Sequence, residues 1–160
     1  MFLSMKIISP ATMESMQGFW NTTPCNTTRT SLPMGTKEFF KDIEKKRYEI
    51  ETHIKQFADF GSWKDKKVLE IGCGLGTDTM QFAQRGALVT AVDYSTSSIS
   101  LAKQNADQRN LSVKFVQANA ERLSEKLPIE VYDLIYSFGV LHHTPNPESA
   151  YLEISKYMNK

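Results

Sequence analysis

The chain has 160 residues, 41% of them hydrophobic, which is enough for a single domain with a substantial core. Its 19 basic and 18 acidic residues are well mixed, and this net charge of +1 gives no electrostatic indication of binding to nucleic acid or to an acidic membrane surface. Cys25 and Cys73 have no zinc-ligand spacing, and the first ten residues, interrupted by Lys6, are too short for a signal peptide or a membrane span; a cytoplasmic protein without a metal site is therefore expected.

Residues 1–36 are rich in Thr, Ser, Pro and Met and have no hydrophobic period, which predicts a mobile N-terminal arm. Within this arm, Phe19 and Trp20 are interpreted as aromatic anchors, with a role in a lid as the alternative. The pattern changes at Lys37, where we expect the folded domain, residues 37–160, to begin.

An amphipathic helix is predicted over residues 37–60, with Gly61 ending it. Charged residues of both signs occupy the other positions and are interpreted as a solvated face. The apolar residues that share one face of this helix are Phe40, Ile43, Ile50, Ile54 and Phe57.

Strands and helices alternate after Lys67. Strands are expected at residues 68–71, 88–92, 113–116 and 132–137. Helical segments are expected at 78–85, from the N-cap Ser95 to about residue 108, at 120–124, and from the N-cap Asn146 to about residue 157. Apolar strands that alternate with helices predict an α/β fold, a Rossmann-like, doubly wound and mainly parallel sheet covered on both faces.

A glycine-rich loop follows the first strand, where Gly72, Gly74 and Gly76 stand at alternate positions. Ligands of doubly wound sheets bind beyond the carboxyl ends of the strands. Asp93 ends the second strand, where its carboxylate can accept both hydroxyls of a ribose. The two features together predict a cofactor of the adenosine type.

Two such cofactors compete. A dinucleotide site requires G-x-G-x-x-G, but Thr77 stands where the third glycine would be. Glu70, two residues before the first glycine, would repel a pyrophosphate but suits the ammonium group of an amino acid. The loop therefore favours S-adenosylmethionine over NAD.

Four ordered motifs resemble those of the class I S-adenosylmethionine-dependent methyltransferases. They are VLEIGCGLGTD at residues 68–78, AVDYS at 91–95, VQANAERL at 116–123 and YDLIYSFGVLHHTPN at 132–146. The segment FWNTTPCNT, residues 19–27, is similar to the N-terminal arm of a bacterial subgroup of that family.

The resemblance implies a role for each candidate cofactor residue. Glu70 and the backbone of the glycine loop would hold the methionine end, Asp93 would bind the ribose, and Tyr94 would lie against the adenine. Asn119 and Ala120 would meet the adenine edge, although the family more often has aspartate at the position of Asn119. The residues that we assign to cofactor binding are Glu70, Gly72, Cys73, Gly74, Gly76, Asp93, Tyr94, Asn119, Ala120 and Phe138.

Methyl transfer is an in-line displacement that needs alignment of the acceptor and exclusion of water, and it requires neither a metal nor a covalent nucleophile. His142 and His143 are candidates for a general base, with a purely structural role in their loop as the alternative. The aromatic ring of Phe138 is expected to favour the positive sulfonium.

The resembled fold has seven strands in the order 3-2-1-4-5-7-6, of which this chain supplies 3-2-1-4. We therefore expect a methyltransferase truncated at its C-terminus, whose fourth strand is an open edge that favours self-association. Three functions stay open: methyl transfer to a small molecule, binding of S-adenosylmethionine or S-adenosylhomocysteine without transfer, and a disfavoured NAD-dependent oxidoreductase.

Overall fold

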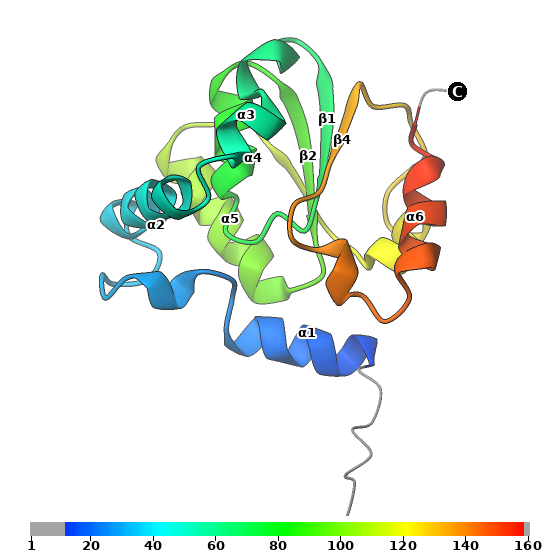
Figure 1. Cartoon of the computed structure of the whole chain (residues 1–160), viewed down its shortest axis with the longest axis horizontal. Helices are drawn as coiled ribbons and strands as arrows, with labels where there is room; N and C mark the ends of the chain where they lie inside the picture. The colour runs from blue at the N-terminus through cyan, green and yellow to red at the C-terminus, as the bar shows by residue number, and fades with distance from the viewer. Residues whose placement is uncertain (1–11, 159–160) are drawn as a thin grey trace, which may run out of the picture.

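The computed structural model describes residues 12–158, and these form a parallel sheet with helices on both sides (Figure 1). The strands are β1 (Lys67–Ile71), β2 (Leu88–Asp93), β3 (Lys114–Gln117) and β4 (Leu134–Tyr136). Their order is β3-β2-β1-β4, and every neighbouring pair runs parallel. The predicted α/β class and strand order are therefore confirmed.

The helical elements alternate with these strands. The α-helices are α1 (Met13–Thr22), α2 (Lys37–Ile50), α3 (Ile54–Ala58), α4 (Thr77–Gln84), α5 (Thr96–Gln108) and α6 (Pro147–Ser155). The short 3-10 turns are η1 (Thr27–Arg29), η2 (Phe60–Trp63), η3 (Ala120–Glu125) and η4 (Leu141–His143).

The core has two layers because successive side chains of a strand point to opposite faces. Val68 of β1 packs in a cluster with Phe82 of α4 and Ile99 of α5. The next residue, Leu69, lies in the opposite cluster with Ile154 of α6. In Figure 1, α4 and α5 accordingly lie on one side of the sheet and α6 lies on the other.

Two helix starts follow the N-cap residues that the sequence indicated. The Ser95 hydroxyl accepts a hydrogen bond from Ser98 N at 3.1 Å at the start of α5. Asn146 Oδ1 accepts one from Ser149 N at 3.1 Å at the start of α6, with Pro147 as the first helical residue. These side chains satisfy backbone donors that have no partner within the helix.

The predicted single helix over residues 37–60 is wrong, because the chain leaves the helix at Glu51 (φ −104°, ψ 61°) and resumes it as α3. Asp59, with a left-handed φ of 41°, ends α3 in place of Gly61. The break lets Ile54 become fully buried against the sheet, whereas Ile50 and Phe57 are each 65% exposed. Tertiary packing of Ile54 thus outweighs the continuation of one helical face.

Residues 1–11 of the predicted arm lie outside the described residues, while residues 12–36 contain α1 and η1. The division at residue 36, and self-association through β4, which is an outer strand of the described sheet, stay predictions. Within residues 12–158, no helix combines the length and the apolar character needed to span a bilayer.

Candidate functional site

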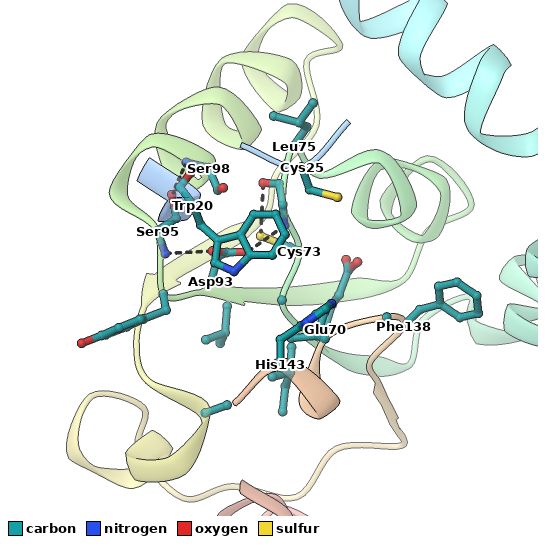
Figure 2. A pocket seen from close by; sticks show the side chains of 18 of the residues that line it. Trp20, Cys25, Glu70, Cys73, Leu75, Asp93, Ser95, Ser98, Phe138 and His143 are labelled. Carbon is teal, nitrogen blue, oxygen red and sulfur yellow. Dashed lines mark hydrogen bonds between the residues drawn. The ribbon is translucent and has the colours of Figure 1, made fainter. Parts of the chain in front are cut away.

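A pocket of about 1070 Å³, its open mouth included, lies at the carboxyl ends of β1, β2 and β4 (Figure 2). This is the position at which doubly wound sheets bind their ligands. The predicted site residues that line it are Glu70, Gly72, Cys73, Gly74, Asp93, Tyr94, Ala120, Phe138 and His143. Gly76, Asn119 and His142 are not among the lining residues.

The three glycines of the loop all have positive φ, but a side chain would meet different surroundings at each of them. A Cβ on Gly72 would lie 2.3 Å from Val140 Cγ2, so this glycine permits close packing of the loop that follows β4. A Cβ on Gly76 would lie 3.2 Å from Ala102 Cβ of α5. A Cβ on Gly74 would meet nothing within 4 Å, because it would point into open space at the pocket. Gly74 is therefore the glycine whose missing side chain leaves room for a ligand.

Asp93 joins the end of β2 to the glycine loop. Its Oδ2 accepts a hydrogen bond from Gly74 N and its Oδ1 accepts one from Ser95 N, each at 2.8 Å. Burial raises the pKa of Asp93, and the backbone donors at Ser95 and Gly74 oppose this increase. Each oxygen retains acceptor capacity, so the fixed carboxylate is oriented to accept from a diol.

Glu70 is a buried carboxyl at the bottom of the pocket, 4% exposed, whose Oε2 accepts a hydrogen bond from the Thr79 hydroxyl. Burial and the neighbouring Asp78 raise the pKa of Glu70 to about 8, while Thr79 and Arg47 lower it. A ligand cation placed beside Glu70 would favour its ionised form.

Asp78 is a buried centre of charge that the sequence did not reveal. Arg47 of α2 donates to it from Nε at 3.1 Å and from Nη2 at 2.7 Å. The hydroxyls of Tyr48 and Tyr136 also donate to it, at 2.8 and 3.0 Å. The sequence placed Arg47 on a solvated helix face, but its side chain is only 12% exposed and lines the pocket. No local signal identified this pair, because its partners are 31 residues apart.

The predicted adenine end is only partly formed by the residues that the sequence named. Tyr94 and Ala120 line the pocket. The Asn119 side chain instead caps η3, its Oδ1 accepting from Glu121 N at 2.8 Å. Asn119 therefore orients the start of η3, where Ala120 lies.

The two histidines of η4 differ in position. The His143 side chain belongs to the pocket wall, and its ring centroid lies 4.0 Å from that of His142. Partial burial lowers the pKa of His143, and His142 lowers it further. A neutral imidazole at the pocket is suited to accept a proton.

The N-terminal arm forms one wall of the pocket. From the sequence, the only sign of this was the aromatic pair Phe19 and Trp20. The Trp20 ring contacts His143 edge to face, with a centroid distance of 5.9 Å. The pocket residues that precede α2 are Met16, Gln17, Trp20, Cys25 and Asn26. Within residues 12–158, no group of three or more His, Cys, Asp or Glu side chains is arranged to hold a metal ion.

The chain is similar to known proteins in sequence and in fold. The chain is 31% identical over 121 residues to the ubiquinone biosynthesis O-methyltransferase of Pseudomonas fluorescens strain Pf0-1, covering 69% of this chain and 52% of that protein. It is 37% identical over 84 residues to the protein of the same name from Photorhabdus laumondii, covering 52% of this chain and 35% of that protein. The chain thus spans about half the length of the Pseudomonas relative.

Among solved structures, the magnesium protoporphyrin IX methyltransferase of Synechocystis PCC 6803 with bound S-adenosylhomocysteine superposes with a TM-score of 0.67. The match covers 90% of this chain and 67% of that one at 18% identity, and it shows a shared fold. The methyltransferase-domain family matches residues 62–160, more than half of the sequence. The chain therefore belongs to the methyltransferase-domain family.

Proposed function

We propose that the pocket binds S-adenosylmethionine and that the chain serves transfer of its methyl group to an oxygen atom of a small molecule. The observation that carries this proposal is the bare Cα of Gly74, open to the pocket between Glu70 and Asp93. A ligand with an amino-acid tail and a ribose fits between these two carboxyls. The name of the Pseudomonas relative, an O-methyltransferase, supports oxygen as the acceptor atom.

Bound S-adenosylmethionine would supply a methyl group on an activated sulfonium. In our assignment Glu70 binds the ammonium group, Asp93 binds the ribose hydroxyls, and Tyr94 and Ala120 lie against the adenine. Neutral His143 accepts the proton that an acceptor hydroxyl releases. Phe138 and Trp20 exclude water from the reacting atoms and provide ring faces suited to a cation.

Calorimetric titration with S-adenosylhomocysteine and, separately, with NAD tests the cofactor. We expect S-adenosylhomocysteine to bind and NAD not to bind, because Thr77 stands where a dinucleotide-binding loop needs its third glycine. Transfer of a tritiated methyl group to a panel of phenols and other small hydroxyl compounds then tests the reaction. A cofactor complex that transfers no methyl group to any of them would support a binding protein instead.

Replacement of Asp93 by alanine is expected to weaken S-adenosylhomocysteine binding by about 1–3 kcal/mol, because charge-assisted bonds to the ribose are lost. Calorimetry measures this change, and thermal unfolding checks that the variant is folded. Asp107→Ala removes an exposed carboxylate outside the pocket and should leave affinity unchanged. Equal affinity of Asp93→Ala and the wild type would contradict the assigned pose.

Cofactor binding should release a proton near pH 7. Glu70 has a raised pKa of about 8 in the free protein and is mainly protonated there, whereas a bound ammonium group would lower that pKa. Affinity should therefore rise with pH between about pH 6 and pH 7.5, below the range in which the ligand's own amino group loses its proton.

Titrations at pH 7 in phosphate and in Tris, two buffers with different ionisation enthalpies, measure the released proton. The observed enthalpies should differ for the wild type and agree for Glu70→Gln, which has no proton to lose. Identical enthalpies for the wild type in both buffers would show that Glu70 does not titrate on binding.

A further inference from the structure

Helix α1 forms one wall of the pocket with little apolar anchoring. Met16, Gln17 and Trp20 line the pocket, yet none of residues 14–22 is fully buried, and Phe19 is 59% exposed. In Figure 1, α1 passes below the sheet as a separate element, at the end where the glycine loop lies. Something other than apolar burial must hold the helix in this position.

A polar latch at the last turn of α1 supplies the attachment. Asn21 Oδ1 accepts a hydrogen bond from Ser95 Oγ at 2.9 Å, and Asn21 O accepts one from Ser97 Oγ, also at 2.9 Å. One turn earlier, Gln17 Nε2 donates to Tyr94 O at 3.0 Å. The latch therefore consists of Gln17 and Asn21 on α1 and of residues 94–97 at the start of α5.

The latch is directly connected to the predicted ribose carboxylate. Ser95 donates its backbone N–H to Asp93 Oδ1 and its hydroxyl to Asn21 Oδ1. At the other side of the pocket, the Trp20 ring meets His143, with an angle of 63° between the planes. Figure 2 shows the Trp20 ring at the pocket, with Asp93 and His143 both below it in this view. Helix α1 thus bridges the end of β2 and the turn that follows β4.

Partly exposed hydrogen bonds of this kind each contribute only about 0.5–1.5 kcal/mol. The closed position of α1 is consequently easy to open, and any ligand that contacts it when closed shifts the population toward closure. A helix held in this way would admit a large ligand when it lifts and retain it when it returns.

We propose that α1 is a strap that closes over the bound cofactor and that Asn21 is the positioning residue that latches it. Closure places Trp20 opposite His143 and completes the wall of the acceptor subsite. This inference rests on the proposed function, since its ligand is the cofactor assigned there.

The test uses Trp20 as its own reporter. The chain contains two tryptophans, so Trp63→Phe leaves Trp20 as the single fluorophore. In this background, Asn21→Ala should make Trp20 more accessible to quenching by acrylamide. It should also weaken S-adenosylhomocysteine binding about tenfold and speed its release in stopped-flow experiments, which corresponds to the loss of one or two hydrogen bonds.

Two further variants make the result specific. Ser97→Ala removes the other part of the latch without altering a pocket residue and should shift quenching and release in the same direction. Thr22→Ala removes only a bond inside α1, from Thr22 Oγ1 to Gly18 O at 2.9 Å, and should behave as the parent does.

Wild-type affinity, release rate and Trp20 quenching in Asn21→Ala would overturn the strap. Failure of the parent protein to bind S-adenosylhomocysteine would count against the proposed function instead. In that case, acrylamide quenching of the ligand-free proteins tests the latch by itself. Equal accessibility of Trp20 in Asn21→Ala and Thr22→Ala would show that Asn21 does not hold α1 in place.

Discussion

Replacement of Asp78 by alanine should lower the free energy of unfolding by about 3–5 kcal/mol, the cost expected when one partner of a buried ion pair is removed. Asp78 is 3% exposed and accepts from Arg47, Tyr48 and Tyr136. Its loss leaves the nearly buried guanidinium of Arg47 with Glu51 Oε2, at 3.0 Å, as its remaining carboxylate acceptor. It also leaves the buried Tyr136 hydroxyl and the partly buried Tyr48 hydroxyl without this acceptor. Chemical denaturation followed by circular dichroism measures the change.

Two comparison variants show whether the unpaired charge is the cause. Arg47→Met combined with Asp78→Ala should recover part of the lost stability, because the guanidinium that loses two of its hydrogen bonds is then absent as well. Glu49→Ala breaks an exposed pair with Lys45 at 3.8 Å and should change stability by less than about 0.5 kcal/mol. A loss below 1 kcal/mol for Asp78→Ala would show that this cluster contributes little to folding.

Replacement of Gly74 by valine should weaken S-adenosylhomocysteine binding by more than about 100-fold, or roughly 3 kcal/mol. The new side chain would meet no protein atom within 4 Å of its Cβ, so it would occupy the space assigned to the ligand. The φ of 54° at Gly74 adds strain for a β-branched residue, which thermal unfolding will register separately from binding.

Other glycine variants distinguish space from strain. Gly74→Ala also places a side chain on a residue with positive φ, but this side chain is smaller than that of valine. The alanine variant should therefore bind S-adenosylhomocysteine more tightly than Gly74→Val. Gly72→Ala should chiefly destabilise the fold, because its Cβ would lie 2.3 Å from Val140. Gly61→Ala has open space outside the pocket and serves as the neutral control. A folded Gly74→Val that binds within threefold of the wild type would refute the assigned ligand position.

The sequence located most of the candidate site because that part depends on local features. Strand ends, N-caps and glycines are set by short-range sterics and hydrogen bonding, so VLEIGCGLGTD and Asp93 predicted where the pocket would form. Parallel strands then brought these two segments together, as the hydrogen bond from Gly74 N to Asp93 shows.

The same local reasoning failed where helix continuity competed with packing. The apolar spacing from Phe40 to Phe57 predicted one helix, but burial of Ile54 against the sheet required a break after Ile50. The assignment of Asn119 to the adenine stays a prediction, and the structure adds that its side chain caps η3. A side chain with a nearby backbone donor has an alternative partner that spacing alone does not reveal.

The sequence by itself determined the fold class, the strand order and the position of the glycine loop and its carboxylate. Only the tertiary structure decided that Arg47 pairs with Asp78, that Trp20 lines the pocket and that Asn21 joins α1 to the start of α5. These contacts join residues at least 31 positions apart along the chain. Their energies depend on burial and on the path of the chain, neither of which is encoded in a local pattern of residues.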